Sequence, residues 1–427
     1  MFWVFYELLF FVGLLITGPY YLWRMRRRGG YARNFGERFG LYSDPVSEIL
    51  SALKNPVWIH AVSVGEVQLA FPLIEALSKR HPDLDVILST TTSTGYALAK
   101  EKESPRVAVI YYPMDSRLFF RKIHELAHPR ALLLVEAELW PNHLLDCARR
   151  GVVLALINAR MSERSYRRYE KFRFLFAPVM AAFNLVTLQS EADRERVAKL
   201  GAREQSLAVI GSLKYGAAAA VDDGRRSKLL GDLAFLRSKP VLVGASTHAG
   251  EEAILLETWR ELKKSRPDLA LVLAPRHVER KPELVRLLGE KQVPFVCRSS
   301  PAAGGDVVLL DTTGDLRYVY ELASIVFIGK SLCGEGGQNL MEPAWYGKAI
   351  VFGPNMQNFR GIVADFLQAR AAVQIPDRFA LVSACKELLN GAGDALGRRA
   401  KELMESRKDV MEKTVVLVEP LVEMRKT

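Results

Sequence analysis

The sequence is poor in the features that mark metal sites, redox sites and the common nucleotide-binding loops. Its 427 residues include four cysteines and seven histidines, dispersed without metal-ligand spacing or an HExxH motif. Dispersed cysteines are typical of reduced thiols in a cytosolic protein and disfavour a disulfide framework. The sequence also lacks a GxGxxG loop with a downstream acid and a Walker A loop, which disfavours dehydrogenases and NTPases. We therefore expect no metal site, and no internal repeat or low-complexity tract is present.

Length and composition indicate a globular α/β protein of two domains. A chain of 427 residues is long enough for two separate cores. Hydrophobic residues make up 49% and charged residues 25%, a balance that excludes intrinsic disorder.

One long apolar run stands at the beginning of the sequence. Residues 2–23 contain a single charge, Glu7, and are followed at once by Arg24, Arg26, Arg27 and Arg28. About 20 apolar residues suffice to span a bilayer, and the basic flank follows the run where a signal peptide would have a cleavage site. Such a flank is less typical of a buried hairpin helix. Residues 1–28 are therefore expected to form an uncleaved single-pass anchor with the rest of the chain in the cytoplasm.

The net charge of +11 indicates either a nucleic acid or an anionic membrane surface as a partner. No nucleic-acid-binding motif accompanies the charge, so we expect no nucleic acid partner. An acidic lipid headgroup or a phosphorylated lipid fits better beside an anchor. A solvated helix face is the alternative for the densest basic stretch, which is interleaved with aromatic residues and comprises Arg160, Arg164, Arg167, Arg168, Lys171 and Arg173.

Apolar segments alternate with amphipathic ones along both halves, the pattern of βαβ units around a parallel sheet. The sequence predicts a Rossmann-like domain at residues 29–216, a linker at 217–235 and a second Rossmann-like domain at 236–427, whose final 50 or so residues look mostly helical. Strands are expected at 57–61, 86–90, 107–111, 131–135, 152–157, 185–189 and 207–210, and then at 241–243, 270–273, 295–297, 307–310, 325–328 and 349–352.

Two carboxylates follow predicted strands in the first half. Glu66 lies where a strand passes into a helix, the edge at which open α/β sheets bind ligands. An acidic residue also stabilises the first turn of a helix, and this structural explanation is the alternative for a lone glutamate. Glu136 closes another apolar strand, where a carboxylate is unfavourable unless it is paired or solvated. Two acidic strand ends together favour a functional site.

Polar residues also follow strands in the second half. A glycine-rich turn with Gly336 and Gly337 precedes a predicted helix that could offer free N–H groups to a phosphate, although a plain flexible turn is the alternative. Glu342, about one turn into that helix, could accept hydrogen bonds from both hydroxyls of a ribose. Two other strand ends carry Ser246 and the pair Arg276 and His277, and arginine can bind a phosphate bidentately. We expect these strand ends to converge on one rim.

Seven motifs, in order and with similar spacing, resemble those of the Kdo transferases of lipopolysaccharide synthesis, which transfer 3-deoxy-D-manno-oct-2-ulosonic acid (Kdo). The resemblance covers the chain from its apolar beginning to about Phe359. The motifs are HAVSVGEV, VEAELWPN, NARMSERS, GSLKY, APRHVER, GGQNLMEPAWYGK and FGPNMQNF.

The resemblance implies a GT-B fold, in which two Rossmann-like domains face a cleft, with a single-pass N-terminal anchor in the bacterial inner membrane. It also implies an inverting transfer of Kdo from CMP-Kdo to a lipid A precursor (lipid IVA), without a metal or a cofactor beyond the donor. The matching motifs assign the catalytic base to Glu66 and a second acid to Glu136. They place the CMP contacts at Arg276, His277, Gly336, Gly337, Asn339 and Glu342, to which we add Ser246 from the neighbouring strand end.

One departure from the family pattern concerns Gln338, which stands where many relatives have histidine. Glutamine keeps a hydrogen-bond donor but cannot titrate, so phosphate or headgroup binding is compatible with it and proton transfer is not. Two alternatives remain open: a GT-B enzyme that uses another nucleotide sugar on a lipid, and a non-enzymatic anchored basic protein that binds lipid. Glu136 could equally orient the acceptor or hold its loop.

Overall fold

A computed structural model describes residues 2–28, 34–136, 138–216, 222–300 and 305–423. Contacts divide the chain into unit 1, Met1–Ala217 with Asp409–Thr427, and unit 2, Ala218–Lys408. The expected linker at 217–235 begins with residues 217–221, which lie outside the described residues. Much of the remainder is helix α10 (Asp223–Asp232), which belongs to unit 2.

Unit 1 is built on a parallel sheet of seven strands in the order β3-β2-β1-β4-β5-β6-β7. Successive side chains point to opposite faces, so Val57 and Ile59 enter one core cluster and Trp58 the other. Burial on both faces explains why the strands are continuous apolar runs. The strands are β1 (Val57–His60), β2 (Val86–Thr90), β3 (Val107–Tyr111), β4 (Ala131–Val135), β5 (Val153–Ala159), β6 (Leu185–Leu188) and β7 (Leu207–Val209).

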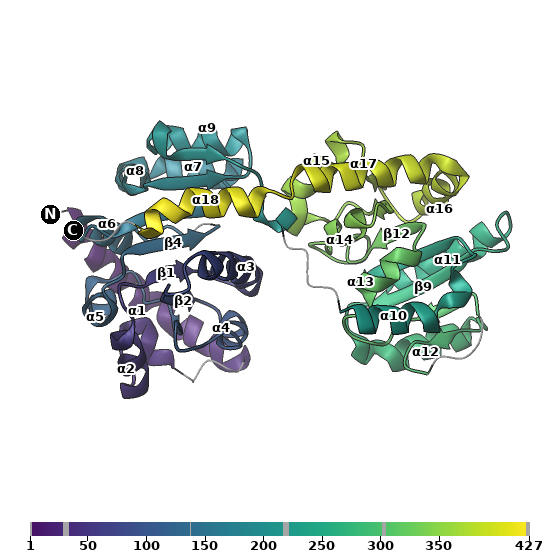
Figure 1. Ribbon diagram of the computed structural model, residues 1–427, viewed down its shortest axis with the longest axis horizontal. Helices are drawn as coiled ribbons and strands as arrows, with labels where there is room; N and C mark the ends of the chain where they lie inside the picture. Colours follow the sequence, from purple (N-terminus) through teal and green to yellow (C-terminus); the bar gives the residue numbers. More distant parts are fainter. Residues whose placement is uncertain (1, 29–33, 137, 217–221, 301–304, 424–427) are drawn as a thin grey trace. The chain divides into compact units, whose positions relative to one another are not determined.

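Helices cover both faces of this sheet (Figure 1). They are α1 (Phe2–Arg28), α2 (Asp44–Ala52), α3 (Val64–Arg80), α4 (Ser93–Lys100), α5 (Arg117–Ala127), α6 (Pro141–Arg149), α7 (Glu163–Lys171), α8 (Arg173–Ala182), α9 (Glu191–Lys199) and α18 (Val410–Glu423), with the short helices η1 (Phe35–Phe39), η2 (Glu204–Ser206) and η3 (Leu213–Gly216).

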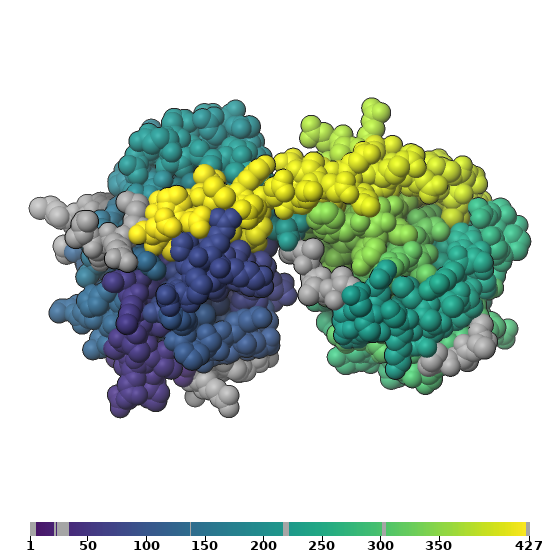
Figure 2. Space-filling model, in the orientation of Figure 1, coloured from purple at the N-terminus to yellow at the C-terminus, as the bar shows by residue number. Residues whose placement is uncertain are grey.

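Helix α18 belongs to unit 1, although the sequence grouped it with the C-terminal domain. Val415 and Val418 are fully buried in the same core cluster as Leu73 and Leu77 of α3. At the edge of this contact, Arg80 of α3 forms ion pairs with two glutamates of α18. In the space-filling view the yellow residues of α18 lie against the dark blue residues of unit 1 (Figure 2).

Unit 2 repeats the architecture with a second parallel sheet of seven strands, in the order β10-β11-β9-β8-β12-β13-β14. The strands are β8 (Val241–Thr247), β9 (Ala270–Pro275), β10 (Val296–Cys297), β11 (Val307–Leu309), β12 (Ile325–Ile328), β13 (Ala349–Phe352) and β14 (Val373–Gln374). The helices are α10, α11 (Glu251–Lys263), α12 (Lys281–Glu290), α13 (Leu316–Val319), α14 (Met341–Trp345), α15 (Arg360–Gln368), α16 (Ala380–Glu387) and α17 (Gly393–Ser406), with the short helices η4 (Ala234–Leu236), η5 (Val278–Arg280), η6 (Tyr320–Leu322), η7 (Gln357–Phe359) and η8 (Leu388–Ala392).

The expected α/β class with two Rossmann-like parallel sheets is confirmed, but the expected transmembrane anchor is not supported. Across the described residues, no helix combines the length and the apolar character needed to cross a bilayer. Helix α1 contains Pro19 and the carboxylate of Glu7, which accepts hydrogen bonds from Ser116 and Asn142 of unit 1 at 2.5 and 3.0 Å. An apolar contact adds to this docking, since Phe11 packs edge-on against Phe119 and both side chains are partly buried. The expected basic flank at 24–28 has side chains outside the described residues.

Candidate functional site

Glu66 lies in the first turn of α3, directly beyond the carboxyl end of β1. One carboxylate oxygen accepts a hydrogen bond from the Val62 amide at 2.7 Å, and the other accepts from the Ser63 hydroxyl at 3.1 Å. These bonds resemble a capping box, because Ser63 is the residue before the helix and Glu66 reaches back to the chain that enters it. The structural explanation of Glu66 therefore has a basis in the fold, and the carboxylate is also held in one orientation.

The surroundings of Glu66 raise the pKa of its carboxyl group into the range that suits a general base near neutral pH. The pKa of Glu66 is raised to about 7, mainly by burial and to a smaller extent by the negative charges of Glu136 and Glu138. The bonds from Val62 and Ser63 act in the opposite direction, because they stabilise the charged form. A carboxylate with this pKa can accept a proton and remains partly ionised at physiological pH.

Glu136 follows β4 and adopts a left-handed backbone conformation with a φ of 67°. Non-glycine residues rarely adopt this conformation, and such strain is concentrated at functional sites. Its carboxylate is 3.2 Å from the Lys214 ammonium and accepts a hydrogen bond from the Asn158 amide at 3.3 Å. Asn158 is the penultimate residue of β5 and is itself left-handed, with a φ of 60°. The two neighbouring strand ends are thus linked through a paired carboxylate.

Glu138 is a residue of this edge that the sequence analysis did not single out. Burial raises the pKa of its carboxyl, and a hydrogen bond from the Trp140 indole at 3.2 Å partly offsets the effect. Since its charge acts on Glu66, the carboxylates of Glu66, Glu136 and Glu138 form one electrostatic group. Its position in the sequence could have identified Glu138 as a site residue, because it lies two residues after Glu136 in the segment that follows a strand.

In unit 2, the glycine-rich turn requires glycine for two reasons. Gly336 and Gly337 have φ values of 110° and 71°, which side-chain-bearing residues rarely adopt. A Cβ atom at Gly337 would also lie 2.2 Å from the Met356 sulfur, and one at Gly336 would lie 2.5 Å from the Asn358 side-chain nitrogen. The turn is therefore packed against residues 356–358, which fixes its backbone.

The loop before this turn is organised by Glu251, another residue that the sequence analysis missed. Its buried carboxylate accepts hydrogen bonds from five backbone amides: four consecutive ones from Lys330 to Cys333, and that of His248. Glu251 thus joins the ends of β8 and β12. In the sequence, Glu251 looks like an ordinary acidic residue in the first turn of a helix. Its contacts with residues about 80 positions later could therefore not be predicted.

The other predicted residues of unit 2 lie at the ends of β8 and β9. Ser246 is left-handed, with a φ of 52°, at an irregularity in the pairing of these two strands. Gln338 lies 3.2 Å from the Nε2 atom of His248, whose ring packs edge-on to that of His277. Arg276 is exposed, and its backbone amide donates to the Thr247 carbonyl. The structure thus brings the β8 and β9 ends together and adds His248 to them.

Asn339 and Glu342 form a small unit beside the glycine-rich turn. The Asn339 amide donates to the Glu342 carboxylate at 3.2 Å, and its oxygen accepts from the Met341 amide at 3.0 Å. Helix α14, which follows, has only five residues. Because a helix dipole sums over its peptide units, this helix contributes less to phosphate binding than the sequence suggested.

Potential metal ligands gather elsewhere in the described part of the chain. Neither of the two groups found there contains a predicted site residue: they are His124, His143 and Cys147, and His81, Glu419 and Glu423.

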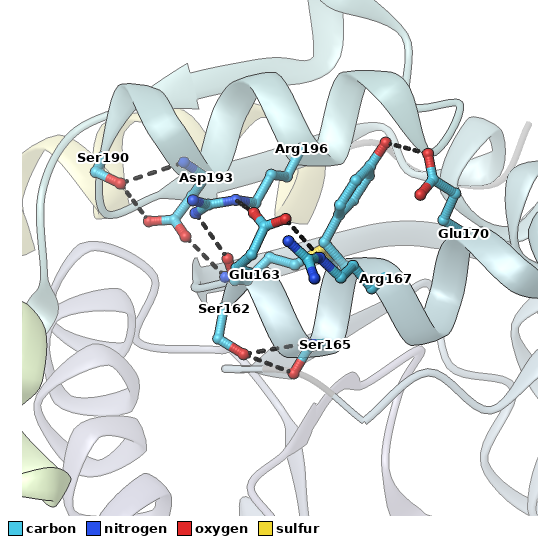
Figure 3. A network of polar contacts seen from close by, with 10 residues as sticks. Ser162, Glu163, Ser165, Arg167, Glu170, Ser190, Asp193 and Arg196 are labelled. Carbon is cyan, nitrogen blue, oxygen red and sulfur yellow. Dashed lines mark hydrogen bonds and ion pairs between the residues drawn. The ribbon is translucent and has the colours of Figure 1, made fainter.

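Four residues of the predicted basic stretch lie on α7 and line a surface cleft of about 590 Å³: Arg164, Arg167, Arg168 and Lys171. Within α7, Arg167 is paired with Glu163, which also binds Arg196 of α9 (Figure 3). Among the described carboxylates, none is within ion-pairing distance of Arg164, Arg168 or Lys171, which also line this cleft. These three side chains are available for an anionic group.

Comparisons with known sequences indicate one family, and comparison with solved structures shows a shared fold. Residues 33–217 match the family described as 3-deoxy-D-manno-octulosonic-acid transferase (kdotransferase). A 3-deoxy-D-manno-octulosonic acid transferase of Bordetella pertussis is 33% identical over 84% of each chain. A bifunctional glycosyltransferase/methyltransferase of Fusobacterium nucleatum is 31% identical over 81% of this chain, which spans 54% of that relative. A glycosyltransferase crystal structure from Rickettsia africae shares the fold, with a TM-score of 0.56 over 87% of this chain and all of that chain at 11% identity.

Proposed function

Because the chain belongs to the family of 3-deoxy-D-manno-octulosonic acid transferases, glycosyltransferases of lipopolysaccharide synthesis, we propose that it transfers Kdo from CMP-Kdo to a lipid A precursor such as lipid IVA. The proposal includes inversion at the anomeric carbon and no metal ion. A new bond forms between the acceptor oxygen and the anomeric carbon while the bond to CMP breaks.

The proposal rests mainly on the position of Glu66 at the end of β1 and on the raised pKa of its carboxyl group. An acceptor hydroxyl is a weak nucleophile, and a carboxylate held beside it can take its proton as the new bond forms. Burial raises the pKa of Glu66 to about 7, so the carboxylate has useful basicity at neutral pH. Its bonds to Val62 and Ser63 keep it oriented. One oxygen has lone pairs left for the substrate in such an arrangement.

Glu136 and Glu138 support this base in different ways. Glu136 is neutralised by Lys214, so it can accept a hydrogen bond from an acceptor hydroxyl or hold the strand end. Glu138 lies against Trp140 and increases the basicity of Glu66 through its charge. Both roles are positioning and electrostatic, whereas proton transfer is assigned to Glu66.

The donor site is assigned to the strand ends of unit 2. Arg276 and His277 would contact the phosphate of CMP, and Ser246, Gly336, Gly337 and Asn339 would approach it closely through their backbone or short side chains. Glu342 would accept hydrogen bonds from the ribose. The leaving CMP needs dipoles and cations to stabilise its charge. Arg276 and the backbone amides at these strand ends can supply them.

The acceptor and the membrane are assigned to unit 1. Arg164, Arg168 and Lys171 would bind an acidic headgroup or a sugar phosphate. Leu15 and Ile16 of α1 are 76% and 74% exposed, which suits contact with lipid. We propose that the protein works at the cytoplasmic face of the inner membrane, held by this apolar surface and by anionic lipid.

The decisive experiment compares two glutamates of the same helix. Glu66→Gln should reduce kcat for Kdo transfer to lipid IVA by roughly 10²- to 10⁴-fold, the usual contribution of a general base. CMP binding should be preserved. Glu75→Gln, on the exposed side of α3 beside Lys79, should keep wild-type turnover.

The assay also separates the alternatives. Turnover of a UDP-sugar without turnover of CMP-Kdo would favour another glycosyltransferase of this fold, and retained activity in Glu66→Gln would contradict the base assignment. If the chain is an anchored lipid-binding protein without catalysis, neither the wild type nor Glu66→Gln would transfer a sugar.

A further inference from the structure

An apolar groove of about 570 Å³ runs beside α1 in unit 1. Leu14 and Gly18 of α1 form one wall, and Phe39 of η1 and Met114 form another. Trp140, which follows β4, also lines the groove. All these residues belong to one unit, so the groove is complete within it.

The groove suits hydrocarbon and lacks the groups that a nucleotide or sugar would need. Arg38 is the single charged residue among the described residues that line it. Its guanidinium is already engaged, donating to the Thr91 carbonyl at 2.6 Å and lying over the Tyr111 ring at 4.0 Å. The phenol of Tyr112, which also lines the groove, is turned to the buried His143 at 2.6 Å. What remains is an apolar surface.

Two residues that line the groove, Trp140 and Thr91, are connected by hydrogen bonds to the surroundings of the proposed base. Trp140 donates its indole hydrogen to Glu138, and the charge of Glu138 acts on Glu66. On the other side, the Thr91 amide donates to the Val62 carbonyl, while the Val62 amide donates to Glu66. The wall of the groove and the carboxylate of Glu66 are therefore fixed to the same short segment of chain.

We propose that this groove binds an acyl chain of the lipid acceptor, with the chain along α1 and the sugar hydroxyl at Glu66. This inference rests on the proposed function. Chain recognition would explain how a membrane lipid presents one hydroxyl to the base, because the groove is lined by α1 on the one hand and by Trp140 and Thr91, which bond to the surroundings of Glu66, on the other. The acyl chain thereby contributes to orientation as well as to affinity.

Two glycines of α1 provide a matched test. A Cβ atom at Gly18, which lines the groove, would meet nothing within 4 Å, and the same holds for Gly13, which does not line it. Gly18→Trp would place its side chain in the groove, while Gly13→Trp makes the same change elsewhere on the helix. Both substitutions raise helix propensity, so neither should unfold α1.

The measured quantity is the preference for an acylated acceptor, taken as the ratio of kcat/KM for lipid IVA to that for its fully deacylated sugar. Each buried methylene is worth about fourfold in binding, so a chain in the groove supplies a large preference. Gly18→Trp should lower this ratio at least tenfold, mainly through KM, while Gly13→Trp keeps it. An unchanged ratio in Gly18→Trp, or no preference in the wild type, would overturn the proposal.

A second measurement does not depend on transfer. Lipid IVA with a diazirine on an acyl chain is photolysed with the full chain in the absence of CMP-Kdo, and the labelled peptides are identified by mass spectrometry. Labels should fall on residues 10–19 and 112–114. Labelling there without any Kdo transfer would refute the proposed function and leave the groove assignment intact. If a diazirine phosphatidylglycerol labels these residues equally well and lipid IVA does not displace it, the groove binds ordinary membrane lipid and the groove assignment is overturned.

Discussion

The raised pKa of Glu66 predicts that its replacement by glutamine removes activity and stabilises unit 1 at alkaline pH. The carboxyl has a pKa of about 7 in the folded chain against 4.5 for an ordinary glutamate, because burial disfavours its charge. A group whose folded pKa is raised contributes stability that is fully present below the unfolded pKa and is lost as pH rises through the folded pKa. The wild type should therefore lose stability between about pH 4.5 and pH 7, whereas the glutamine variant does not titrate.

The size of this effect follows from the pKa difference. At 1.36 kcal/mol per pKa unit, a rise from 4.5 to about 7 corresponds to roughly 3 kcal/mol. Partial exposure of the carboxylate reduces this figure, so we expect the stability advantage of Glu66→Gln to grow by about 1 to 3 kcal/mol between pH 5 and pH 8. Glutamine can still accept the Val62 hydrogen bond, which keeps the local structure similar at both pH values.

The assay is urea unfolding of the full chain at both pH values, followed by hydrogen exchange of peptides from β1 and α3 so that the signal reports unit 1. Glu75→Gln is the control, since the pKa of Glu75 is lowered by its bond to Lys79 and its titration ends below this pH range. If wild type and Glu66→Gln change equally with pH, Glu66 is not a carboxyl of raised pKa and the reasoning is refuted.

Three further predictions address the two sites. The kcat/KM of the wild type should rise with pH through an inflection near pH 7. Glu138→Gln should move that inflection to lower pH, because a negative charge near Glu66 is removed. An unchanged pH profile would contradict the effect of the Glu138 charge on Glu66. Glu251→Ala should weaken CMP binding at least tenfold by calorimetry, since four consecutive amides lose their acceptor, and unchanged affinity would separate this loop from the donor site. Gly337→Ala should destabilise unit 2 by about 1 to 3 kcal/mol, measured by thermal unfolding, because the backbone is left-handed and the new methyl would collide with Met356; an unchanged transition would show that the turn relaxes.

The strands were predictable from sequence because both sheets are buried on both faces. Segments such as 107–111 and 131–135 are continuous apolar runs, and they form β3 and β4 at those positions. Strand β14 was not predicted, because it has only two residues and neither of them is buried. Helix α18 was assigned to the wrong part of the fold because its partners in α3 lie more than 300 residues away, and periodicity carries no information about such contacts.

At the candidate site, sequence indicated which strand ends carry polar groups but not how they are joined. Glu66 and Glu136 were predicted from their positions after strands, and their roles remain predictions. The contacts of Glu251 with the loop before the glycine-rich turn depend on tertiary structure and had no local signal. The apolar beginning of the chain predicted a membrane span because a run of hydrophobic residues fits a bilayer and a docked helix equally well. Among the described residues the structure does not support the span, and Glu7 and Phe11 of α1 contact unit 1.

The return of α18 to unit 1 has a consequence for the order in which the protein can fold during synthesis. Unit 2 is a continuous segment and can complete its core once the ribosome has released about residue 408, but unit 1 lacks Val415 and Val418 until later. We therefore expect nascent chains stalled before residue 409 to have a protease-resistant unit 2 and a protease-sensitive unit 1. The half of the protein that is translated first would then be the last to become stable.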